Sequence, residues 1–187
     1  MLNAEILENM FGSDEAFGMR FRVFNRDFTP KLDENGDQVY LTAEEMRKNE
    51  DISLEVLSEF PNGDDGVVPY YFAQHVMEIM ANNFGDTHSC HIVEFETTNP
   101  NSRVCDINPL QEYALVVIDY RYLIDPANKI VFDVNDHAVF DLENPDHLRK
   151  AQKLYGNPER WVGSDGWMLE KMPAEFRHPS NQIQAAP

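Results

Sequence analysis

Apolar residues recur at helical spacing in three stretches of the chain, which predicts three amphipathic helices. The longest spans residues 69–84, where Pro69 suits the first turn and Gly85 favours the end of the helix. Two shorter helices are predicted at 3–11 and 146–155.

Two more helices are predicted between the helix at 3–11 and the helix at 69–84. Thr42 followed by Glu45 has the spacing of a capping box and should open a short helix. Asp51 is expected to cap the next one. Its inward face would carry Ile52, Val56, Leu57 and Phe60.

Alternating or continuous apolar runs bounded by turn residues predict the strands. They cover 20–25, 38–41, 91–96, 113–119, 122–124 and 129–132. Residues 119–121 are expected to form a tight turn between two hairpin strands. Short helices followed by a run of hairpin strands indicate the α+β class, with an antiparallel sheet and helices packed on one face. We expect a single domain over 1–170 and a partly ordered tail over 171–187.

Charge changes this picture of an ordinary globular chain. The sequence has 33 acidic and 15 basic residues, for a formal charge of −18. Residues 49–102 contain ten Asp or Glu and no Lys or Arg. Such a field repels nucleic acid and anionic membranes and attracts basic protein surfaces. Solubility alone and bound cations are the two alternative explanations of the charge.

The richest run of acids lies just before the longest predicted helix. A surface for a basic partner is predicted there, formed by Glu50, Asp51, Glu55, Glu59, Asp64 and Asp65. On the predicted second helix, Asp51, Glu55 and Glu59 would share one face. Tyr70 and Tyr71 could supply aromatic anchors beside the acids. The alternative is an ordinary solvated face.

Oxygen ligands at calcium-loop spacing occur once. Asp33, Asn35, Asp37 and Glu44 occupy the positions of such ligands, and the stretch resembles an EF-hand loop. Gln38 stands where that loop requires glycine. The alternative is a hairpin turn with Asn35 and Gly36 at its apex.

Only two cysteines, Cys90 and Cys105, are present, which indicates a reducing, cytoplasmic location. Neither a secretory leader nor an apolar run long enough to span a membrane is recognised. His88 and His91 beside Cys90 are residue types that zinc prefers, although their spacing is not that of a zinc motif.

The stretch EYALVVIDYRYLIDP, residues 112–126, resembles the closing hairpin of papain-fold, transglutaminase-like thiol hydrolases. The resemblance implies that Asp125 matches the aspartate that orients a catalytic histidine in that family. Tyr113, or Glu112 in the neighbouring register, stands where the histidine belongs. Cys90 or Cys105 would be the nucleophile, and the missing imidazole implies an inactive copy.

The leading functional hypothesis is a non-enzymatic binding protein or inhibitor that engages a basic protein surface, without cofactor and without binding nucleic acid itself. By analogy of charge, it would act as a nucleic-acid mimic of the kind that phages and mobile elements encode. The alternatives are a thiol hydrolase or transferase on a papain-like scaffold, and a calcium-binding module.

Overall fold

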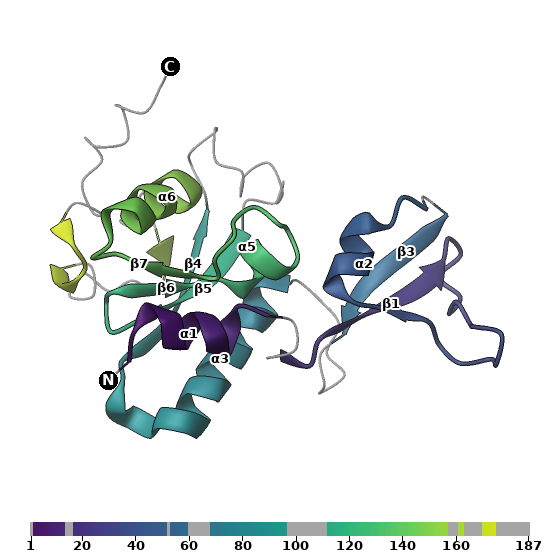
Figure 1. Cartoon of the computed structure of the whole chain (residues 1–187), viewed down its shortest axis with the longest axis horizontal. Helices are drawn as coiled ribbons and strands as arrows, with labels where there is room; N and C mark the ends of the chain where they lie inside the picture. The colour runs from purple at the N-terminus through teal and green to yellow at the C-terminus, as the bar shows by residue number, and fades with distance from the viewer. Residues whose placement is uncertain are drawn as a thin grey trace, which may run out of the picture.

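A computed structural model describes residues 2–13, 17–51, 53–59, 68–96, 112–156, 161–162 and 170–174. It contains two antiparallel sheets with helices around them, which confirms the α+β class. Figure 1 shows a small lobe to one side of a larger one. We use "small lobe" for residues 17–59 and "main lobe" for the rest of the described chain.

The small lobe is built on a three-stranded sheet in the order β2-β1-β3. Its strands are β1 (Arg20–Asn25), β2 (Tyr40–Leu41) and β3 (Leu54–Glu59). Helix α2 (Ala43–Lys48) follows β2 and begins with the predicted capping box between Thr42 and Glu45. An arm between β1 and β2 extends from the lobe in Figure 1.

The main lobe holds a five-stranded sheet in the order β7-β6-β5-β4-β8. These strands are β4 (Cys90–Glu96), β5 (Glu112–Ile118), β6 (Tyr122–Ile124), β7 (Val139–Asp141) and β8 (Trp161–Val162). The predicted tight turn joins β5 to β6, and Arg121 N donates to Ile118 O at 3.0 Å. Asp119 and Tyr120 both have positive φ there, the geometry whose twist matches a two-residue hairpin.

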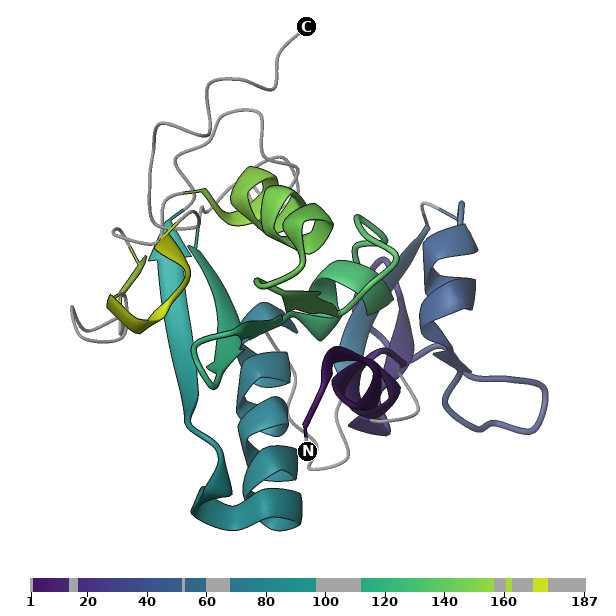
Figure 2. The ribbon, with the colours of Figure 1, turned by 60° about the vertical axis from the view of Figure 1, so that its left-hand side comes forward.

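Helices cover both faces of this sheet, rather than the one face predicted. The main-lobe helices are α1 (Ala4–Phe11), α3 (Val68–Phe84), α5 (Pro126–Ile130) and α6 (Pro145–Tyr155), with a short 3-10 helix η2 (Gly85–Thr87) after α3. Alternate β5 residues point to opposite sides, so that Val116 packs with α1 and α3 while Val117 packs with α6. Figures 1 and 2 show α3 and α6 on either side of the strands.

One hydrophobic cluster joins the two lobes. Phe17, Phe21 and Ala43 of the small lobe are buried in the same cluster as Phe72 of α3 and Phe11 of α1. Phe21 of the small sheet and Ala43 of α2 therefore share a core with the main lobe.

Two predicted elements are wrong in type. The helix predicted after Asp51 is the strand β3, which pairs with β1 along six residues. The strand predicted at 129–132 is the end of α5 and the turn after it. Asp125 caps that helix and Pro126 is its first residue, a start signal that outweighs the apolar run.

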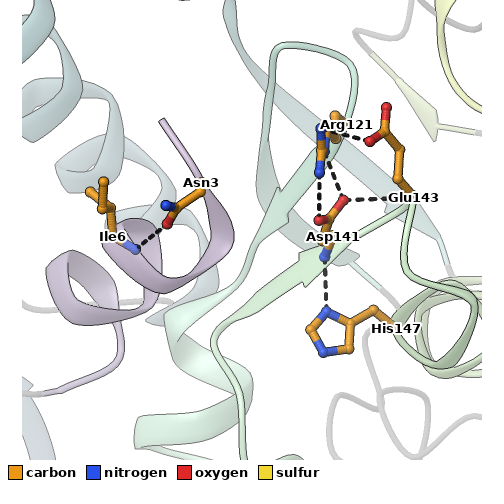
Figure 3. Close-up of polar contacts among 6 residues, drawn as sticks. All are labelled: Asn3, Ile6, Arg121, Asp141, Glu143 and His147. Atoms are coloured by element: carbon orange, nitrogen blue, oxygen red, sulfur yellow. Dashed lines mark hydrogen bonds and ion pairs between the residues drawn. The ribbon is translucent and has the colours of Figure 1, made fainter. Parts of the chain in front are cut away.

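Glu8 ties α1 to two distant parts of the main lobe. Asn3 caps the helix by accepting from Ile6 N at 2.9 Å, as Figure 3 shows, which fixes the start of α1. One turn later, the Glu8 carboxylate accepts from Lys129 Nζ at 2.6 Å and from Val139 N at 2.9 Å. Helix α1 is thus held to α5 and β7 by a charge-assisted bond and a backbone bond.

Replacing Glu8 with Gln should destabilise the protein by about 1–3 kcal/mol, because the amide nitrogen cannot accept from the buried backbone N–H groups. The free energy of unfolding in urea measures this loss. Glu5→Gln is the matched control, since Glu5 is an exposed acid of the same helix and should change stability by less than about 0.5 kcal/mol. Equal effects of the two substitutions would contradict this role of Glu8.

Candidate functional site

The small lobe has acids in each of its parts, and those with described side chains face solvent. Every one whose side chain is described is exposed, and we call them the acidic surface: Asp27, Asp33, Glu34, Asp37, Glu44, Glu45, Glu50, Asp51 and Glu55. They come from the arm, from α2, from β3 and from the segment that leads into β3. The outside of the small lobe therefore displays nine carboxylates to solvent.

Most cations of the same lobe are engaged within the protein. The Arg20 guanidinium lies 3.9 Å from the centroid of the Tyr40 ring, and that of Arg22 lies 5.0 Å from that of Phe24. Arg47 donates to the carbonyl of Ile130 in the main lobe, and Lys48 pairs with Glu44. Four of the lobe's six Lys and Arg residues are thus directed to internal contacts.

Hydrogen bonds from nearby groups favour the ionised form of three acids of this surface, Asp27, Asp33 and Asp51. The Thr29 hydroxyl and amide lower the pKa of Asp27, and the backbone amides of Asp37 and Asn35 lower the pKa of Asp33. The Ser53 hydroxyl and amide do the same for Asp51. Each bond favours the charged carboxylate. The surface should therefore keep its negative charge well below neutral pH.

The predicted calcium loop is a hairpin arm, as the alternative interpretation holds. Asp33 Oδ1 accepts from the amides of Asn35 and Asp37, and Gly36 has a φ of 88° at the apex. Glu44 lies on α2 and pairs with Lys48 instead of with the arm. Within the described ranges, no group of three His, Cys, Asp or Glu side chains is placed to hold a metal ion.

The predicted partner residues divide between the lobes. Glu50 and Asp51 lead into β3 and Glu55 lies on it, so that these acids do not form a helical row. Tyr70 and Tyr71 lie in the first turn of α3 in the main lobe, with their rings edge to face at 6.3 Å and Tyr70 41% exposed.

The structure does not describe the side chains of the three other predicted acids. Glu59 is described only as part of the backbone of β3. Asp64 and Asp65 lie outside the described residues.

Two large apolar side chains on the arm are also exposed, and the sequence pattern did not single them out. Phe28 is 65% exposed at a positive φ of 61°, and Leu32 is 56% exposed. The Phe28 turn is held by its own amide, which donates to Asn25 O at 2.8 Å. Exposed apolar groups among charges are typical of protein-binding surfaces.

Asp125 lies at the centre of a buried polar network in the main lobe. It is 1% exposed, and its carboxylate accepts from the hydroxyls of Tyr155 at 2.8 Å and Tyr113 at 3.2 Å. The backbone amide of Asn128 also donates to it at 3.1 Å. Burial raises the pKa of Asp125 to about 6, although these hydrogen bonds oppose the shift.

The residues of the thiol-hydrolase resemblance are only partly brought together. Tyr113 contacts Asp125, but both face α6, on the opposite side of the sheet from α3. Cys90 is at the other end of β4, opposite Ile118. Cys105 lies outside the described residues. Within the described residues, Tyr113 and Asp125 thus form a buried pair with no thiol beside it.

Cys90 lies next to a histidine–aspartate pair formed by His88 and Asp119. His88 Nδ1 is 2.6 Å from Asp119 Oδ2, while the Cys90 thiol donates to the carbonyl of His88 at 3.8 Å. Burial, together with the negative charge of Asp119, raises the pKa of Cys90 to about 11. A thiol in this setting is protonated at neutral pH and is a poor nucleophile.

A charged cluster that no sequence pattern indicates lies at the β6–β7 edge of the main sheet. Figure 3 shows the Arg121 guanidinium bound through two nitrogens to Asp141, each at 2.8 Å, and also paired with Glu143 at 2.6 Å. His147 Nδ1 accepts from the amide of Asp141 at 3.1 Å. These contacts join the β5–β6 turn to β7 and α6, which indicates a structural role.

Comparison with known proteins identifies no relative: no family model, curated protein or solved structure matches this chain. None of the helices in the described part of the chain is both long enough and apolar enough to cross a membrane.

The buried Asp125 should make stability depend on pH in a defined direction. The folded protein binds the Asp125 proton more tightly than the unfolded chain, whose pKa is near 3.8. Its contribution to stability is therefore full below about pH 4 and is lost as the pH rises through about 6. Relative to Asp125→Asn, the wild type should lose up to about 3 kcal/mol between pH 4 and 7.

Urea unfolding of both proteins across this range gives the difference. Asp133→Asn, at an exposed carboxylate, should show no such pH-dependent difference. A difference between wild type and Asp125→Asn that is flat with pH would show that Asp125 titrates normally.

Cys90 should react slowly with iodoacetamide. In a Cys105→Ser background, we expect its alkylation at pH 8 to be at least about tenfold slower than that of free cysteine, because little thiolate is present. Asp119→Asn should speed the reaction, whereas Asp86→Asn, at an exposed acid on η2, should not. Mass spectrometry follows the rate, and half-maximal reactivity at or below pH 8 would contradict the buried, protonated thiol.

Proposed function

We propose that this chain is a non-enzymatic binding protein whose acidic surface engages a basic surface on another protein. One observation carries the proposal: the small lobe displays its acids to solvent while most of its cations are engaged in internal contacts. The outward field of the lobe is therefore negative, and it steers positively charged partners toward it.

The arm adds the apolar component that a specific interface needs. Phe28 and Leu32 are exposed between the acids Asp27, Asp33 and Glu34. Charged rims speed encounter, whereas buried apolar and aromatic anchors supply most of the binding energy. This combination distinguishes a binding surface from acidity that serves solubility alone.

Partners that normally hold DNA or RNA suit this surface well. Their grooves are lined with Lys and Arg spaced to meet phosphates. Hydrogen bonds favour the ionised form of Asp27, Asp33 and Asp51, and these carboxylates can occupy such a groove in place of phosphates. The chain would then act as an inhibitor of a nucleic-acid-binding protein.

The thiol-hydrolase alternative gains little support from the geometry. Asp125 and Tyr113 are buried together, and Cys90 lies elsewhere with a raised pKa. The polar network around Asp125 is better understood as part of the packing between α5, α6 and the sheet.

Location of the charge, rather than its amount, should decide binding. A triple variant Glu50→Lys, Asp51→Lys and Glu55→Lys reverses three acids of the small lobe. Glu5→Lys, Asp86→Lys and Glu94→Lys reverses three exposed acids of the main lobe. Three reversals of two units each change the formal charge from −18 to −12 in both variants.

Pull-downs from cell extract compare the variants with the wild type at about 50 mM and about 500 mM salt, which differ strongly in screening. We expect the wild type to retain a basic protein only at low salt, the small-lobe variant to lose it, and the main-lobe variant to keep it. Partners that survive high salt, or equal losses in both variants, would refute the proposal.

A further inference from the structure

The strand β3 lies at the edge of the small sheet and has one open side. In the order β2-β1-β3 it pairs with β1 alone, and the described chain places no other strand against it. Of the described strands at sheet edges, β3 is the longest, with six residues; β2, β7 and β8 have two or three. An edge of this length is a template for another strand.

The register shows which backbone groups point outward from β3. Val23 donates its N–H to Val39 O and accepts from Lys31 N, so both of its backbone groups face the arm side of β1. Val23 and its partner on β3, Val56, therefore form a non-hydrogen-bonded pair. It follows that the N–H and C=O of Val56 point away from β1, toward the open edge.

Side chains along the same edge define what a new strand would carry. The Val56 side chain is half-buried against the core, while its neighbour Glu55 is exposed on the other face. Side chains directly opposite each other in a sheet interact, so an apolar residue would suit the position beside Val56. Lys or Arg would suit the position beside Glu55. The preceding acids, Glu50 and Asp51, extend the same preference.

Charge also argues against a second copy of this chain as the occupant. Two β3 edges paired with each other would bring Glu55 and its neighbouring acids close to the same acids of the partner copy. Like charges across a sheet are destabilising, and an inward or edge charge is a common way to prevent self-pairing.

We propose that the open edge of β3 accepts an extended segment of a basic partner, in which Lys or Arg alternates with an apolar residue. The segment adds a fourth strand to the small sheet by bonding to the backbone of Val56, and its cations meet Glu55 and the acids before it. This inference rests on the proposed function and specifies how the acidic surface holds its partner.

A labelled peptide of alternating lysine and valine is the probe, and fluorescence anisotropy gives its Kd. Two further peptides carry N-methyl groups, one on every valine and the other on every lysine. Only one set of peptide N–H groups can face β3, so methylation of one set should weaken binding at least about tenfold, and methylation of the other should have little effect.

Variants of the protein give the complementary test. Val56→Pro removes the outward N–H without removing a bond to β1, whereas Val56→Ala removes the side chain and keeps the N–H. We expect Val56→Pro to raise the Kd at least about fivefold more than Val56→Ala does. Glu55→Gln should raise it by up to about fivefold and reduce its salt dependence.

The outcomes separate the two proposals. If the unmethylated peptide binds in a salt-sensitive way and the two methylated peptides have equal Kd values, strand addition is overturned. The proposal that the acidic surface binds a basic partner then still stands. A concentration-dependent dimer in sedimentation that Val56→Pro abolishes would show that a second copy occupies the edge, which also overturns it. If no basic probe or partner binds at low salt, both proposals fail. The methylated peptides keep the test valid even if Val56→Pro does not fold.

Discussion

Burial of β5 on both faces is the constraint on which the rest of the structure depends. Val116 and Ile118 need cover on one side of the strand, and Leu115 and Val117 need it on the other. Helices α1 and α3 supply the first cover and α6 the second, and the Glu8 and Arg121 contacts hold these layers in place. Phe21 and Ala43 of the small lobe join the core on the first side, and the described acids of that lobe stay exposed.

The small lobe carries nine exposed acids. Local hydrogen bonds favour the ionised form of Asp27 and Asp51, and aromatic rings and a main-lobe carbonyl engage most of the arginines of this lobe. The lobe therefore presents an acidic surface to solvent. An open strand edge beside Glu55 gives this surface backbone groups that can bind in a defined register, so that charge selects the partner and the main chain holds it.

Local signals in the sequence predicted much of the fold. Alternation gave β1, the capping box gave α2, and Pro69 with Gly85 marked α3 within a residue at each end. The segment after Asp51 misled because Val56 and Leu57 fit a helical face as well as a strand. The segment forms a strand because it pairs with β1, which is distant in the sequence. For 129–132, the apolar run favours a strand, but the helix start signal at Asp125 and Pro126 prevails.

The candidate sites were less predictable, because they depend on residues far apart in the chain. Asp125 was singled out, but its bond to Tyr155 requires α6 to be docked on the sheet. The engagement of Arg20 and Arg22 by aromatic rings needs the register of β1, and the exposure of Phe28 needs the shape of the arm. Net charge per segment locates the excess of acids along the chain but does not show which face of the molecule carries it.

Zero-length carbodiimide cross-linking of the complex recovered at low salt tests the central claim most directly, because it joins carboxylates only to lysines that they touch. We predict that mass spectrometry will map the cross-links to acids of the small lobe between Asp27 and Glu55. Cross-links concentrated on Glu5, Glu78, Asp86 or other acids of the main lobe would contradict the assignment of binding to the acidic surface.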